Sequence, residues 1–130
     1  MASGLVGGIG DMPVPSKALF TDYEISLQQQ TGGVDNWQPY STAGTDCYVY
    51  DYDVLTDFPT AQFDANSVCS LLPRGTITQS LIEGYSWINA CEAVAITVND
   101  TNKNVLRIYS FKGKPNTDIN LTLRIHKKTI

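Results

Sequence analysis

The sequence has little charge: Asp, Glu, Lys and Arg make up only 17% of its 130 residues, against about 25% in an average domain. Its 9 basic and 13 acidic residues give a formal net charge of -4. The basic residues form no stripe interleaved with aromatic residues. Because Lys and Arg that neutralise phosphates supply most non-specific affinity for nucleic acid, we expect no nucleic-acid partner.

Histidine is almost absent, since His126 is the only one in the chain. Nucleophilic catalysis needs a base beside the nucleophile. His126 lies near the C-terminal end, in the basic stretch 124–128, which we expect to be solvated. The sequence therefore predicts a protein that is not an enzyme, with no catalytic residue and no cofactor.

Cysteine and long apolar runs are also scarce. The odd count of three cysteines, without a C-x-x-C pair, predicts no disulfide scaffold and too few ligands for a metal site. We expect buried or free thiols in a protein that folds in a reducing cytoplasm. No stretch approaches the about 20 apolar residues of a membrane span, and the opening residues lack the basic region of a signal peptide. The cysteines are Cys47, Cys69 and Cys91.

Residues 1–19 differ from the rest of the chain, because glycines and alternating prolines break up any helix or strand period. A disordered tail is the plain interpretation. The segment is nevertheless more apolar than disordered tails usually are. We therefore predict an extended N-terminal arm that becomes ordered by docking on a neighbouring protein. Its assembly contacts are predicted at Leu5, Val6, Ile9, Met12 and Val14.

Residues 20–130 predict one all-β domain, a small antiparallel β-sandwich or jelly-roll-like fold. Period-two alternation and turn-forming residues mark its strands. One short helix is expected at 76–89, where apolar residues recur at three and four. The expected strands are 23–27, 47–54, 93–98, 105–111 and 119–125. Strands 93–98 and 105–111 are expected to pair as a hairpin, joined by a connector at 99–104. The apolar face of the last strand consists of Ile119, Leu121, Leu123 and Ile125.

The strand at 47–54 carries an acidic face. Alternation places Asp51 and Asp53 together, where two carboxylates could hold Ca²⁺ or act as an acid and a base. A solvated sheet face is the favoured interpretation, so no metal ligand is predicted, although cation binding by this pair stays open. The opposite face consists of Tyr48, Tyr50, Tyr52 and Val54.

Aromatic residues suggest a second kind of site, because exposed rings stack on sugars. Core packing is the alternative, and we expect it for Tyr48 and Tyr50. Trp37 lies in an expected loop with Tyr40, among polar residues. Trp37 and Tyr40 are therefore the predicted contacts for a cell-surface glycan.

Several segments together resemble small β modules of tailed-bacteriophage virion proteins. They are Trp37 with Pro39 and Tyr40, the strand that leads to 51–54, the hairpin strand 105–109 and the last strand 118–125. Such modules occur in head fibres, capsid-decorating proteins and tail-fibre tips, and they often form trimers. No functional residue transfers from this resemblance.

The resemblance implies a virion structural protein, a capsid-decorating or short head-fibre protein that binds other virion proteins through its arm and forms a homotrimer. The first alternative is a tail-fibre or baseplate receptor-binding module for host attachment, which recognises host surface glycan. The second is a small hydrolase that uses the acidic face. Both a head and a tail location are compatible with the sequence.

Overall fold

The computed structural model describes residues 19–40, 47–73, 88–111 and 113–127. The predicted arm, 1–19, lies outside these residues apart from Leu19. The elements are β1 (Phe20–Leu27), β2 (Gln30–Thr31), β3 (Val34–Asp35), β4 (Gln38–Pro39), β5 (Tyr48–Tyr52), α1 (Val54–Asp57), β6 (Val68–Pro73), β7 (Ile88–Val98), β8 (Thr101–Ser110) and β9 (Ile119–His126). No helix among the described residues is long and apolar enough to cross a membrane.

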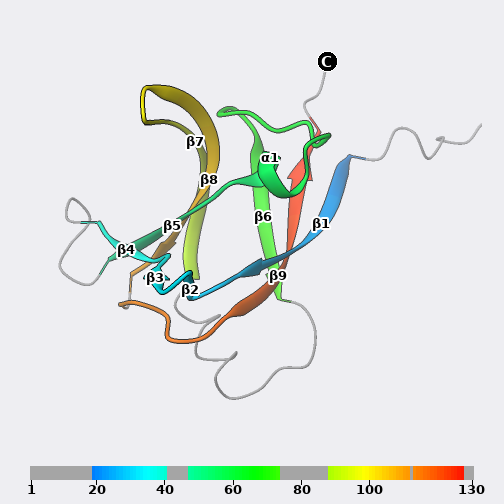
Figure 1. Cartoon of the computed structure of the whole chain (residues 1–130). Coiled ribbons are helices and arrows are strands. Elements are labelled where there is room, and N and C mark those ends of the chain that lie inside the picture. The colour runs from blue at the N-terminus through cyan, green and yellow to red at the C-terminus, as the bar shows by residue number, and fades with distance from the viewer. Residues whose placement is uncertain (1–18, 41–46, 74–87, 112, 128–130) are drawn as a thin grey trace, which may run out of the picture.

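The strands form two main antiparallel sheets, which confirms the predicted all-β class. The first sheet has the order β1-β9-β6, and the second has the order β4-β5-β8-β7. A small two-stranded sheet, β2-β3, lies between β1 and β4 along the chain. Figure 1 shows the two main sheets on either side of the molecule, with β6 and β7 adjoining.

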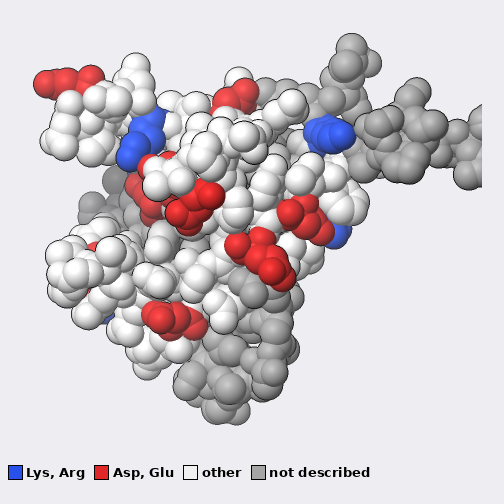
Figure 2. All heavy atoms as spheres, turned by 45° about the vertical axis from the view of Figure 1, so that its right-hand side comes forward, with Lys and Arg blue, Asp and Glu red and all other residues white. Residues whose placement is uncertain are grey.

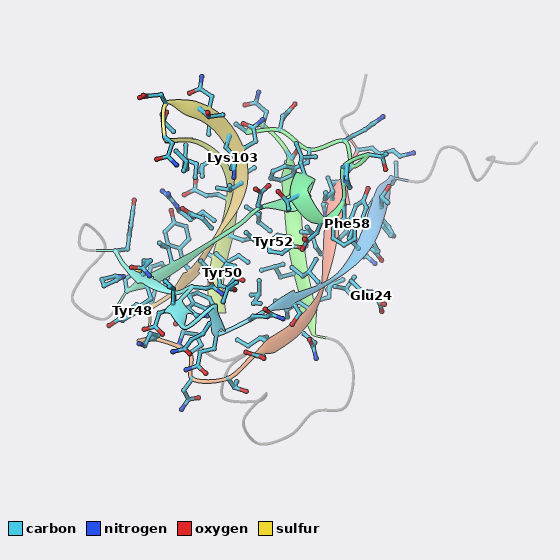
Figure 3. The ribbon with its side chains drawn as sticks, viewed as in Figure 1. Glu24, Tyr48, Tyr50, Tyr52, Phe58 and Lys103 are labelled. Atoms are coloured by element: carbon cyan, nitrogen blue, oxygen red, sulfur yellow. The ribbon has the colours of Figure 1, made fainter. Side chains whose placement is uncertain are left out.

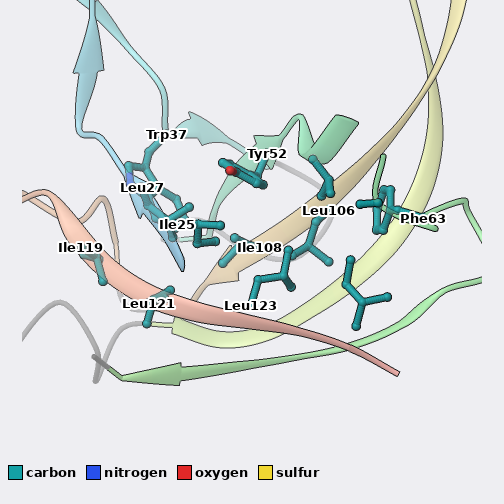
Figure 4. Packing of buried hydrophobic residues seen from close by; sticks show 13 residues of the cluster. Ile25, Leu27, Trp37, Tyr52, Phe63, Leu106, Ile108, Ile119, Leu121 and Leu123 are labelled. Atoms are coloured by element: carbon teal, nitrogen blue, oxygen red, sulfur yellow. The ribbon is translucent and has the colours of Figure 1, made fainter. Parts of the chain in front are cut away.

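The apolar core fills the space between these sheets (Figure 4). On β9 the predicted alternation is confirmed, because Ile119 and Leu123 are fully buried and Leu121 is 2% exposed. Burying each such side chain contributes about 1.5–3 kcal/mol relative to leaving it in water. The second sheet contributes Leu106 and Ile108 of β8, both fully buried. The sandwich is therefore held together by apolar side chains from both sheets.

The predicted hairpin is present as β7 and β8, with a tighter connection than expected. The strands are joined by Asn99 and Asp100 alone, which have φ values of 52° and 63°. Two consecutive residues with positive φ are typical of the two-residue hairpin turn, and Asn and Asp tolerate this conformation better than other side chains. The expected connector at 99–104 is wrong from residue 101 onward, because β8 already begins at Thr101.

The helix expected at 76–89 falls outside the described residues as far as residue 87. Its last two positions, Ile88 and Asn89, belong to β7, so a helix ending at 89 was wrong. The described helix is α1, which begins where strand 47–54 was expected to continue. Asp53 caps it by accepting hydrogen bonds from the backbone N–H and hydroxyl of Thr56. Such capping satisfies a helix N–H that has no partner inside the helix.

Candidate functional site

Trp37 does not contact solvent, which corrects its prediction as a glycan contact. Only 1% of the residue is exposed. Its ring packs edge to face against Tyr50, with centroids 5.3 Å apart. A buried indole has no free face on which a sugar can stack. Trp37 therefore belongs to the core. Tyr48 and Tyr50 pack against that core, as predicted for them.

The tyrosines of β5 show how this side of the core is built. Figure 3 shows Tyr50 and Tyr52 following each other along β5, and Phe58 close to β1. The hydroxyl of Tyr52 donates a hydrogen bond of 2.7 Å to Asp57 of α1. Burial, and then this bond to a carboxylate, raise the pKa of Tyr52 well above its ordinary value. These rings are structural, and α1 is fastened to the sheet by one of them.

Tyr40, the other predicted glycan contact, lies in a different environment. It is half-buried, and its ring meets Tyr109 edge to face, with centroids 5.6 Å apart. Tyr109 in turn stacks on Phe111 at 5.8 Å and an interplanar angle of 16°. Because Leu106 and Ile108 face the core, Tyr109 projects from the opposite side of β8. We call Tyr40, Tyr109 and Phe111 the aromatic surface.

Charged groups hold the aromatic surface in place. The guanidinium carbon of Arg107 lies 5.7 Å from the centroid of Tyr40, within range of a cation–π interaction. The hydroxyl of Tyr109 donates a hydrogen bond to Glu92 on β7. Burial, followed by this bond, raises the pKa of Tyr109 above its ordinary value. With Phe111 47% exposed, the aromatic surface presents a ring that an incoming ligand can reach.

The two carboxylates of the acidic face do not share a site. Asp51 forms two hydrogen bonds with Arg107, whereas Asp53 pairs with Lys103 at 2.9 Å and caps α1. Partial burial acts to raise the pKa of Asp53, but hydrogen bonds from Lys103 and Thr56 outweigh it and lower the pKa below its ordinary value. A general acid needs the opposite shift. Among the described residues no group of three or more His, Cys, Asp or Glu side chains could hold a metal ion, and each of these two carboxylates is paired with a basic side chain.

His126 has a hydroxyl partner that the sequence did not reveal. Its Nε2 lies 3.1 Å from Ser70 Oγ on the neighbouring strand β6. A catalytic triad would also need a carboxylate on the imidazole. Asp22 lies two register positions away on β1, and both of its carboxylate oxygens instead accept hydrogen bonds from Arg124, at 2.9 and 3.0 Å. His126 also packs edge to face with Phe20, at 6.4 Å between centroids. This is the packing of a sheet surface.

Two of the three cysteines meet where the sheets adjoin. The Sγ of Cys91 on β7 lies 3.7 Å from the carbonyl oxygen of Cys69 on β6. Burial, together with the nearby thiol of Cys91, raises the pKa of Cys69 to about 12. Burial likewise raises the pKa of Cys91 and of Cys47. All three are free thiols, as predicted, and each stays protonated near neutral pH.

A pocket that the sequence did not predict opens at the end of the first sheet. It has a volume of about 840 Å³. Its walls come from three segments: the start of β1, the end of β9 and the stretch 60–67, which precedes β6. No sequence period connects these segments, so only the fold brings them together. We call it the β1–β9 pocket; its lining is Thr21, Tyr23, Thr60, Ala61, Gln62, Phe63, Asp64, Ser67, Ile125, His126 and Lys127.

The fold and these sites define a class, an all-β protein of two packed antiparallel sheets with ligand-accessible groups on its surface. Comparison of the chain with protein-family models, with curated proteins and with solved structures found no match.

Proposed function

We propose that the chain is a bacteriophage virion structural protein, a capsid-decorating or short head-fibre protein. In this proposal the arm, 1–19, docks on another virion protein, and the β-sandwich projects from the particle. The observation that supports it most is the packed core of the described residues. The buried core of the described residues runs from Ile25 to Ile125 and is closed by β1. The described part of the two sheets thus contains a packed core of its own, and we propose that the arm adds attachment rather than core.

The junction between arm and sandwich is fixed in place. The backbone N–H of Lys127 donates a hydrogen bond of 2.8 Å to the carbonyl of Leu19. Leu19 itself is 71% exposed, as the chain enters β1 beside the end of β9. This hydrogen bond holds the start of β1 beside the end of β9, where the proposed arm would join the domain.

Exposed apolar residues fit a protein that is covered in an assembly. Val68 of β6 is 65% exposed and Phe20 of β1 is 38% exposed. Both lie opposite His126 in the register of the first sheet, so they share one row across it. We propose that such residues help to form a homotrimer. Light scattering on the purified full chain at micromolar concentration tests this, and a clean monomer mass would contradict it.

The surface charge is consistent with partners other than nucleic acid. On the face drawn in Figure 2, the acidic side chains form separate groups, with few Lys or Arg side chains beside them. Several acidic residues are matched by a basic residue, as in the pairs Arg124–Asp22 and Lys114–Asp35. The described residues on this face form no continuous basic stripe for a phosphate backbone.

The decisive experiment removes the arm. Deleting residues 1–19 should leave the melting temperature nearly unchanged, because the sandwich has its own core, and should abolish incorporation into virions. A matched pair of full-length variants refines it. Replacing Leu5, Val6 and Ile9 by Ser should prevent incorporation, whereas Ser3→Ala with Asp11→Asn should not. Normal copy number of the truncated chain on particles would refute attachment by the arm.

The second candidate function is a tail-fibre or baseplate receptor-binding module that recognises host surface glycan. The aromatic surface favours it, because Tyr40, Tyr109 and Phe111 are contiguous and Phe111 is exposed. A glycan array probed with the full chain and with Phe111→Ala tests it. Loss of a signal in Phe111→Ala, with Val34→Ala as the exposed apolar control, would support this function. An array without any signal would count against it.

A further inference from the structure

We infer that the β1–β9 pocket is a binding site for a neutral carbohydrate. Its volume of about 840 Å³ lies within the range of roughly 300–1,000 Å³ typical of small-molecule sites. That space is large enough for a short oligosaccharide. The inference shares only its ligand class with the second candidate function, and it concerns residues on the other sheet.

The rim of the pocket carries uncharged hydrogen-bonding groups. Thr21, Thr60 and Gln62 are exposed pocket residues, and the hydroxyl of Ser67 and the phenol of Tyr23 add to them. Hydroxyls both donate and accept, and an amide offers two donors and an acceptor. The hydroxyls of a sugar need this mixture of donors and acceptors, whereas a ligand that only accepts hydrogen bonds would leave the acceptors of the pocket unpaired.

The inner wall of the pocket is apolar. Phe63 is 7% exposed and Ala61 is 9% exposed, and both line the pocket beside Ile125. Tyr23 is held by Phe58, with ring centroids 4.8 Å apart. A fixed ring has little rotamer freedom left to lose when a ligand binds. Sugar rings carry C–H groups on their faces, so an apolar wall with a polar rim matches their two kinds of surface.

The charges of the pocket argue against an anionic ligand. Its lining contains one carboxylate, Asp64, and one ammonium group, Lys127, besides the imidazole of His126. Sites for phosphate or sulfate use clustered Arg, Lys or backbone N–H groups. The carboxylate would repel such a ligand and offset the attraction of the single lysine. A neutral ligand has no such penalty here.

The structure of the 60–67 stretch supports a preformed site. The backbone N–H of Phe63 bonds to Ala61 O at 3.1 Å, and that of Ala61 bonds to Phe58 O at 3.0 Å. Further along, Asp64 N–H donates to Ser67 Oγ at 2.9 Å. These turns fix the backbone of the wall before any ligand arrives, which reduces the ordering cost of binding.

The experiment measures binding of glucose, galactose, mannose and N-acetylglucosamine to the full chain by saturation-transfer NMR, with glucuronic acid and inorganic sulfate as anionic probes. We expect at least one neutral sugar to bind with a Kd of about millimolar order, as is usual for weak complexes. The double variant Thr60→Ala/Gln62→Ala should weaken it about tenfold, which corresponds to about 1.4 kcal/mol. The matched control Thr97→Ala/Asn102→Ala, near the exposed tip of the β7–β8 hairpin, should bind normally.

Three outcomes would overturn the inference. The first is no binding of any neutral sugar at concentrations well above the millimolar range. The second is binding of the anionic probes alone. The third is sugar binding that Phe111→Ala abolishes and Thr60→Ala/Gln62→Ala does not, because the ligand would then sit on the aromatic surface. Incorporation into virions is measured separately, so failure of attachment by the arm and failure of sugar binding are distinguishable.

Discussion

The guanidinium of Arg107 binds both carboxylate oxygens of Asp51, with Nε to Oδ1 at 2.8 Å and Nη2 to Oδ2 at 3.0 Å. The two residues lie directly opposite each other on β8 and β5. This bond raises the pKa of Arg107 further above its ordinary value, although partial burial acts against it. The same guanidinium rests against Tyr40, so the ion pair also positions the aromatic surface.

Breaking this pair should cost stability while leaving the fold intact. Asp51→Asn should lower the free energy of unfolding by about 1 kcal/mol, the upper range for partly exposed ion pairs, because the bond is bidentate. Urea titration measures this loss of unfolding free energy. The single variant Arg107→Met and the double variant Asp51→Asn/Arg107→Met complete a double-mutant cycle. Calcium should leave the melting temperature of the wild type unchanged. A calcium-dependent rise that Asp51→Asn removes would revive the cation site.

The alternation of β9 makes a sharper stability prediction. Leu121→Ala and Leu123→Ala should each cost about 2–5 kcal/mol, since truncation leaves a cavity in the core. Thr122→Ala should cost little, because that side chain faces away from the core. Urea unfolding of the three variants tests this, and equal, small losses would mean that the face of β9 has been assigned wrongly.

Acid should weaken the fold through paired aspartates. The hydrogen bond from Arg124 lowers the pKa of Asp22, and that from Lys114 lowers the pKa of Asp35. A carboxyl whose pKa is lower in the folded state adds stability above its unfolded pKa of about 3.9, and this is lost as the pH falls through the folded pKa. The free energy of unfolding should therefore decline below about pH 4.

Asp53 offers the matched test of that decline. Its pKa is also lowered, and Asn caps a helix about as well as Asp. Asp53→Asn should thus keep the bond to the backbone N–H of Thr56 that caps α1, while it removes the titrating charge and its pair with Lys103. The loss of stability between pH 7 and pH 3, measured by urea unfolding, should be smaller in Asp53→Asn than in the wild type. An identical loss would show that the Lys103 pair contributes nothing to the pH dependence.

The cysteines should react slowly until the protein unfolds. A thiol whose pKa is raised to about 12, as for Cys69, holds far less of the reactive thiolate at pH 8 than an ordinary cysteine does. Cys47 is protected in addition by burial, being only 3% exposed. Ellman's reagent should therefore titrate the thiols rapidly in urea and slowly in buffer. Immediate release of colour from the native protein would contradict this, and Cys69→Ala would identify the residue.

The strands were predictable where one face is wholly buried. Ile119 to Ile125 alternate without exception, so burial and period two coincide in the sequence. The turn residues Asn99 and Asp100 indicated the hairpin. They did not indicate how short its connection is, because polar residues such as Asn102 and Lys103 continue into β8. The start of α1 was missed, since Val54 also completes the alternation of β5.

The sites were much less predictable, because they depend on which strands become neighbours. Trp37 and Tyr40 lie three residues apart around the two-residue strand β4, and no period told which ring faces the core. Asp51 and Arg107 are 56 residues apart in the sequence. The turn-rich stretch 60–67 gave no signal of a pocket wall, because that role arises only when β1 and β9 are placed beside it.

The place of β9 in the first sheet has a consequence for folding order. β9 is the middle strand, so Phe20 pairs with His126 and Val68 pairs with the same residue from the other side. During synthesis β1 emerges first, yet neither β1 nor β6 can pair until residues 119–126 have left the ribosome. Pairing over such sequence separations is slow, and exposed strands can associate with other chains. Assembly of the first sheet therefore waits on β9, and chaperone binding to β1 and β6 during translation would favour it.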